Sequence, residues 1–121
     1  MAQVEPKIAV EYAGNATIAV LTAKKILRED EVAALEASMM PLIEAESGVN
    51  LVIDFSGVEF LTSSVLGLLI RISKRVYQAE GQLALCNIIP KILEIFKITR
   101  LTNIFDIYDD IETATKALSP S

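Results

Sequence analysis

The sequence contains no histidine and a single cysteine, and these two shortages exclude several kinds of site. Without histidine the chain lacks the usual base of a serine or cysteine catalytic triad and the commonest transition-metal ligand. Cys86 cannot form an internal disulfide, and its apolar surroundings in the sequence favour a buried thiol over a nucleophile. No glycine-rich loop has the spacing of a P-loop or a dinucleotide-binding motif. The sequence therefore predicts no enzyme, no metal site and no bound cofactor.

Long apolar runs and an excess of basic residues are also missing. The densest apolar run, Val65 to Ile70, ends at Arg71, far short of the roughly 20 residues that span a bilayer. The first residues, MAQVEPK, contain neither a basic start nor an apolar segment, so no secretion signal is expected. The net charge of −5 would repel nucleic acid. We therefore expect a cytoplasmic protein without nucleic-acid binding or direct membrane insertion.

The chain contains enough aliphatic side chains to form the hydrophobic core of one domain. It has 121 residues, of which 52% are hydrophobic and only 6% aromatic. This length is close to the commonest domain size and allows one proper core. The sequence predicts a single domain over residues 1–121, with an aliphatic core spanning about 7–118.

The order of the predicted elements indicates an α/β fold. Strands at Ile8–Tyr12 and Thr17–Leu21 flank Gly14-Asn15, which is a hairpin signal. Apolar residues then recur at three- and four-residue steps from about Glu29, which predicts a helix that Pro41 should kink or end early. The remaining predicted elements are strands at 50–55, 83–86 and 104–108 and helices at 63–80, 90–98 and 110–118. Together they predict a small mixed β-sheet with helices packed on it.

Asp54 ends a predicted strand, where α/β proteins often place function, and a receiver domain would use such an aspartate as its phosphoacceptor. A receiver would also need acidic residues after its first strand and a lysine after its last one. The sequence has neither, since Leu21-Thr22-Ala23 ends the second strand and two aspartates follow Tyr108. The receiver hypothesis is therefore disfavoured.

The helix predicted from Ser63 carries more apolar residues than a single core-facing stripe requires. Thr62 or Ser63 is suited to cap it. Its excess of apolar side chains must be covered either by neighbouring elements or by another protein. Leu66, Leu69 and Ile70 have core-like spacing, which leaves Val65, Leu68 and Ile72 as the expected exposed face.

At this segment the sequence resembles the STAS-domain family, whose best-known members are bacterial anti-sigma factor antagonists. The resemblance lies in the loop 56–61, Ser-Gly-Val-Glu-Phe-Leu, and in Ser63-Ser64-x-Leu66-Gly67 at the helix start. It continues through residues 81–86, the proline-led helix and the segments 99–101 and 104–108. The resemblance implies a STAS-like fold for most of the chain.

The resemblance further implies a partner switch. In the family, the unphosphorylated domain binds an anti-sigma factor that is a serine kinase, and a sigma factor is released. The kinase phosphorylates the serine at the helix start, which falls on Ser63, with Ser64 as the alternative, and a serine phosphatase reverses this. The partner-binding residues expected on this basis are Thr62, Ser63, Ser64, Val65, Leu68 and Ile72.

The site departs from the family pattern at several positions. Thr62 replaces the usual aspartate before the serine, and Val65 replaces a glycine. Lys24 to Leu27 stands where members often have Gly-Glu-Leu-Asp, and Arg28 falls near that acidic position. An alternative function therefore stays open: a STAS scaffold that is never phosphorylated, or the small subunit of a lipid-transport ABC complex.

Overall fold

A computed structural model describes residues 7–45 and 47–118. Its elements are, in chain order, β1 (Ile8–Ala13), β2 (Ala16–Leu21), β3 (Lys25–Ile26), α1 (Glu29–Glu44), β4 (Asn50–Asp54), β5 (Phe60–Leu61), α2 (Ser63–Gln78), β6 (Gln82–Cys86), α3 (Pro90–Ile98), the 3₁₀ turn η1 (Leu101–Asn103), β7 (Asp106–Tyr108) and α4 (Ile111–Leu118). The expectation about a secretion signal concerns residues 1–7, of which 1–6 lie outside the described residues. Across the described ranges, no helix is long and apolar enough to cross a bilayer.

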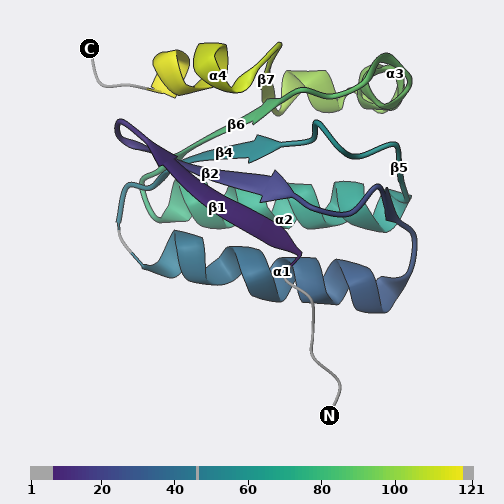
Figure 1. The fold of residues 1–121 in the computed structure, drawn as a ribbon, viewed down its shortest axis with the longest axis horizontal. Coiled ribbons are helices and arrows are strands. Elements are labelled where there is room, and N and C mark those ends of the chain that lie inside the picture. Colours follow the sequence, from purple (N-terminus) through teal and green to yellow (C-terminus); the bar gives the residue numbers. More distant parts are fainter. Residues whose placement is uncertain (1–6, 46, 119–121) are drawn as a thin grey trace.

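The main sheet has five strands in the order β1-β2-β4-β6-β7, and only β1 runs antiparallel to its neighbour. Helices α1 and α2 lie on one face of this sheet and α4 on the other (Figure 1). Because both faces are covered, the central strand β4 is apolar on both sides: Leu51 and Ile53 enter the core under α2, and Val52 enters the core under α4. The predicted mixed sheet with packed helices is confirmed.

The predicted hairpin is confirmed, and its turn explains its sequence. Ala13 pairs with Ala16, which leaves Gly14 and Asn15 as a two-residue connection. Gly14 has a φ of +59°, a left-handed conformation that glycine adopts without steric cost. The hairpin places β1 at one edge of the sheet.

Helix α1 does not end early at Pro41 but continues to Glu44. Its buried stripe consists of Val32, Leu35, Met39 and Ile43. Pro41 cannot donate a hydrogen bond to the carbonyl of Ala37, one turn earlier. Both residues are exposed, so water can satisfy that carbonyl. The helix tolerates Pro41 because the residue lies on its solvent-exposed side.

The short strands β3 and β5 were not predicted. They pair in parallel, with Lys25 opposite Phe60 and Ile26 opposite Leu61. The backbone N–H groups of Glu59 and Phe60 also donate to the carbonyl of Lys24, at 2.7 and 3.1 Å. This pairing fastens the loop before α2 to the loop after β2.

Helix α2 begins at Ser63 as predicted but ends at Gln78, two residues earlier than expected. The left-handed residue after it is Glu80, with a φ of 63°. Gly81 is required for a different reason, because a Cβ there would collide with the carbonyl oxygen of Val49. The chain therefore needs glycine at 81 to bring α2 close to the start of β4.

The elements of the last third of the chain are those predicted, with starts that differ by one or two residues for β6, β7 and α4. Helix α3 begins at Pro90 as expected, since proline suits the first turn. Strand β7 is shorter than predicted because the 3₁₀ turn precedes it. Asp110 accepts a 2.8 Å hydrogen bond from the backbone N–H of Thr113, and this bond lowers the pKa of the Asp110 carboxyl. Asp110 thus caps the start of α4.

Candidate functional site

The motif loop begins at Asp54, the last residue of β4, whose side chain is only 3% exposed. Its carboxylate accepts hydrogen bonds from the backbone N–H of Ser56 at 3.1 Å and from the Ser56 hydroxyl at 3.0 Å. The amide of Asn87, which follows β6, donates a third at 2.8 Å. A buried carboxylate needs such partners to be stable. Asp54 therefore anchors the loop to the ends of two neighbouring parallel strands.

Cys86 lies beside this anchor and is fully buried, as the sequence predicted. Burial, together with the nearby carboxylate of Asp54, raises the pKa of the thiol to about 12. Since the thiolate is the nucleophile, the thiol is inert at neutral pH. Within the described ranges, no three His, Cys, Asp or Glu side chains gather in a way that could hold a metal ion.

The loop delivers Ser63 and Ser64 to the surface at the start of α2. Thr62 is the N-cap, with extended backbone (φ −99°, ψ 170°), and its carbonyl accepts the N–H of Val65 at 3.0 Å. Its side chain makes no capping hydrogen bond. Ser63 and Ser64 are both exposed. The first backbone N–H groups of a helix have no partner within the helix, so this end carries open donors and the positive end of the helix dipole.

The expectation that Val65, Leu68 and Ile72 form an exposed face of the helix is wrong. They are 0%, 0% and 1% exposed and belong to the main core. The buried positions of α2 are Val65, Leu66, Leu68, Leu69, Ile72, Ser73 and Val76. At 100° per residue they cover an arc of roughly 160°, more than one packing layer requires. Helix α2 packs against both the sheet and α1, and these two contacts cover the apolar excess.

Exposed apolar side chains do surround the start of α2, but they come from its flanks. Phe60 in β5 is 43% exposed, and Leu27, just after β3, is 51% exposed. The ammonium of Lys91 lies 3.5 Å from the centre of the Phe60 ring, and that of Lys25 lies 5.3 Å from it. These distances are in the range of cation–π contacts. Ser63 is thus three residues along the chain from an aromatic ring that two lysines contact.

Sequence reasoning missed Leu27, Phe60 and the two lysines as parts of this site. Phe60 belongs to the motif loop, and its large apolar side chain beside a predicted helix start was a usable signal. The contribution of Lys91 could not be found, because it comes from α3, 31 residues further along the chain. Arg28, which falls where the family often has an acidic residue, donates two 3.0 Å hydrogen bonds to the carboxylate of Asp30.

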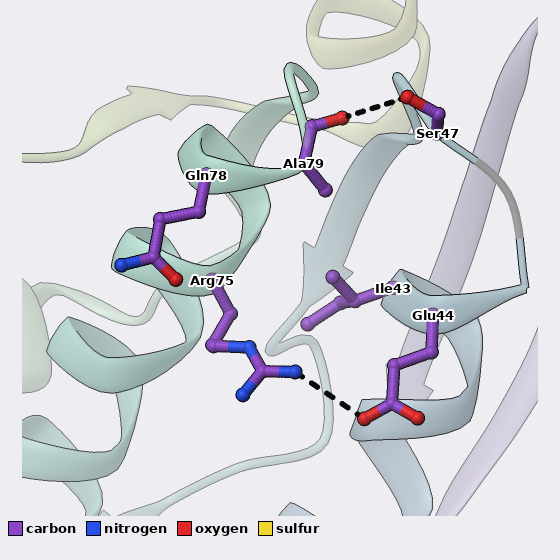
Figure 2. Close-up of a pocket in the computed structure, with 6 residues that line it drawn as sticks. All are labelled: Ile43, Glu44, Ser47, Arg75, Gln78 and Ala79. Atoms are coloured by element: carbon purple, nitrogen blue, oxygen red, sulfur yellow. Dashed lines mark hydrogen bonds and ion pairs between the residues drawn. The ribbon is translucent and has the colours of Figure 1, made fainter.

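A hollow lies between the C-terminal ends of α1 and α2, far from Ser63, and Figure 2 shows it. It has a volume of about 410 Å³ and is lined by Ile43, Glu44, Ser47, Arg75, Gln78 and Ala79. Arg75 and Glu44 form an ion pair at 3.4 Å across it, and the Ser47 hydroxyl donates to the carbonyl of Ala79 at 3.3 Å. Twelve residues of helix separate Ser63 from Arg75, roughly 18 Å. This hollow is therefore not part of the Ser63 site.

The chain belongs to the STAS domain family, because the family model matches residues 9–114. This match includes the whole main sheet apart from the first residue of β1, and it covers the motif loop and α2. The resemblance inferred from the sequence is thus confirmed.

Solved structures and a curated relative agree with this family. A STAS domain protein of Planctomyces limnophilus, described as an anti-sigma factor antagonist, superimposes with a TM-score of 0.85 at 25% identity, covering 93% of this chain and 98% of that one. An anti-sigma factor antagonist from Mycobacterium paratuberculosis gives 0.79 at 25% identity, with 92% of each chain covered. BtrV of Bordetella bronchiseptica, named as a candidate anti-sigma factor antagonist, is 28% identical over 68 residues. That match spans 56% of this chain and 59% of BtrV.

Proposed function

We propose that this chain is an anti-sigma factor antagonist that works in the cytoplasm as a phosphorylation-controlled partner switch. In the unphosphorylated state it binds an anti-sigma factor that is a serine kinase, and this binding releases a sigma factor. The kinase phosphorylates Ser63, and a serine phosphatase restores the first state. The domain itself catalyses no reaction. Its family and the antagonists that it resembles support this function.

The observation that carries the proposal is the exposed Ser63 at the uncapped start of α2. A phosphate bound to this serine would lie near free backbone N–H groups and the positive end of the helix dipole. It would therefore leave the helix intact. It would add about 1.5 to 2 negative charges to the surface that a partner must cover. The switch then acts at the interface with little change of fold.

The partner-binding surface in this proposal consists of Thr62, Ser63 and Ser64 together with the exposed side chains of Leu27 and Phe60. The two apolar side chains gain from leaving water when a partner docks. Burying a phosphate beside them costs its hydration, which weakens the complex. The buried residues of α2 serve only to fix the position of the helix.

The proposal is tested by incubating the full chain with each serine kinase encoded in the source genome and measuring intact mass. The cognate kinase should add one phosphoryl group to wild type and none to Ser63→Ala. The matched control is Ser64→Ala, an exposed neighbour that should be modified as wild type is. The phosphorylated chain should bind that kinase more than about tenfold more weakly, or about 1.4 kcal/mol. Modification that persists in Ser63→Ala and disappears in Ser64→Ala would move the site by one residue.

The second candidate function is a STAS scaffold that is never phosphorylated, or the small subunit of a lipid-transport ABC complex. It is favoured by Thr62, which stands where the family usually has an aspartate before its phosphoacceptor. Binding to an anti-sigma factor without modification by any kinase would support the scaffold. A neighbouring ABC-transporter operon would support the transport subunit, whereas neighbouring kinase and phosphatase genes would support the switch.

A further inference from the structure

The outer edge of β1 has no pairing partner among the described strands. β1 is the first strand in the sheet order, and its inner edge pairs with β2 along its whole length. Edge strands present a row of backbone donors and acceptors to which another chain can add. No proline interrupts β1, and its middle residues are exposed. The edge is therefore available along the strand.

The hydrogen-bond phase of the hairpin determines which residues face this outer edge. The N–H of Thr22 donates to the carbonyl of Lys7 at 3.2 Å, which continues the register in which Ile8 lies opposite Leu21. In an antiparallel pair, alternate residues bond to a given neighbour. The odd-numbered residues of β1 therefore bond to β2. Ile8, Val10 and Tyr12 direct their N–H and C=O groups outward.

We infer that two copies of this chain pair through β1, antiparallel and about a two-fold axis at Val10. In this register Val10 lies opposite Val10 of the second copy, and Ile8 lies opposite Tyr12. All three are outward-facing residues, so each pair can exchange both backbone hydrogen bonds. The two sheets would then become one continuous sheet, with α1 of both copies on the same side. A two-fold contact of this kind is self-complementary and closed.

The side chains of β1 suit this register. Val10 is 38% exposed and Tyr12 75% exposed, and both lie on the face of the sheet where Ile8 packs. Pairing would bring the Tyr12 ring against Ile8 of the second copy, a type of cross-strand contact that stabilises sheets. The free chain leaves these apolar groups in water.

The charges of β1 favour the axis at Val10 over its neighbours. With this axis Glu11 lies opposite Ala9 of the second copy, and its two diagonal neighbours on the same face are Lys7 and Glu11 of that copy, of which Lys7 can form an ion pair with it. An axis at Glu11 would set that carboxylate opposite its own copy, and like charges there are destabilising. An axis at Ala9 would leave Tyr12 outside the paired part of the described strands. The register at Val10 alone pairs all three outward residues of the described strand without setting like charges directly opposite each other.

The first test measures sedimentation of the full chain from about 10 µM to about 1 mM, a range that detects weak dimers. Wild type should form a reversible dimer. Val10→Pro should weaken it more than tenfold, because it removes an outward N–H while the bonds to β2 remain, and edge strands tolerate proline. Val10→Thr keeps the N–H and a β-branched side chain and should dimerise as wild type does. Circular dichroism of both variants checks that they are folded.

The second test exchanges charges. Lys7→Glu and Glu11→Lys should each weaken the dimer, and the double variant should restore it. Within one chain the two residues are about 13 Å apart along the strand, so this rescue reports on pairing between chains. A wild type that stays monomeric to about 1 mM would overturn the inference, as would a dimer unaffected by Val10→Pro and by the charge changes. No kinase or partner enters these measurements, so their result is independent of the proposed function.

Discussion

Helix α2 has an inward arc, formed by its buried positions, and an outward arc formed by the others, and the two differ in what their side chains contact. On the inward arc, Val65, Leu68 and Ile72 are almost completely buried between the sheet and α1. On the outward arc, Gly67 is half-buried and Arg71 is exposed, and Arg71 forms an ion pair with Glu36 at 3.3 Å. The difference shows that an apolar helix need not be a docking helix. The partner-binding surface that we propose lies at the start of α2 instead.

The largest effect that this comparison predicts is that of Leu68→Asp on the inward arc. It would bury an unpaired carboxylate in the main core, where Leu68 is 0% exposed. We expect the free energy of unfolding to fall by about 4 kcal/mol or more, which is enough to unfold a domain of ordinary stability. Circular dichroism and urea denaturation would measure this loss.

The matched control for Leu68→Asp is Lys74→Asp, which places the same side chain on the outward arc. Lys74 is exposed, so its replacement should change the free energy of unfolding by no more than about 0.5 kcal/mol. A folded Leu68→Asp variant with near wild-type stability would contradict the assignment of the two arcs.

A smaller loss of stability is expected for Gly81→Ala, at the point where the chain returns from α2 to the sheet. A Cβ there would meet the backbone of Val49, with the amide nitrogen at 3.1 Å and the carbonyl oxygen closer still. Backbone cannot rotate away as a side chain can, so the strand start must shift. We expect a destabilisation of about 1 to 3 kcal/mol in chemical denaturation. A variant as stable as wild type would show that this close approach is not required.

The smallest effect, and of opposite sign, is expected for Gly67→Ala on the outward arc. An added Cβ would come no closer than 3.9 Å to its nearest neighbour outside the helix backbone, the flexible guanidinium of Arg71. Alanine is favoured over glycine inside a helix by up to about 1 kcal/mol. The melting temperature should therefore rise by roughly 3 to 6 °C. A fall would reveal a packing role that this space does not suggest.

The parts of the fold that the sequence predicted are those with local signals. Gly14-Asn15 marks the hairpin and Pro90 the start of α3, and both act through their own backbone preferences. β3 and β5 could not be predicted, because two-residue strands have no periodicity and exist only through pairing with each other.

The candidate site was predicted in part for the same reason. The position of Ser63 at a helix start follows from neighbouring residues and is confirmed. Which face of α2 is exposed could not be predicted in this way. The sequence shows how much of a helix is apolar but not how many neighbouring elements pack on it. The contacts of Lys25 and Lys91 with the Phe60 ring could not be predicted, because they join three separate segments of the chain.

The exposure of Ser63 and Ser64 at the start of α2 has a consequence for how this domain can evolve. Since the described structure gives Ser63 and Ser64 no role in packing, substitutions there should scarcely change the stability margin that limits most mutations. Selection can then act on these two positions through the kinase and the partner that we propose for them. A duplicated copy of the gene could acquire a new partner at this end of α2 while its core sequence stays fixed.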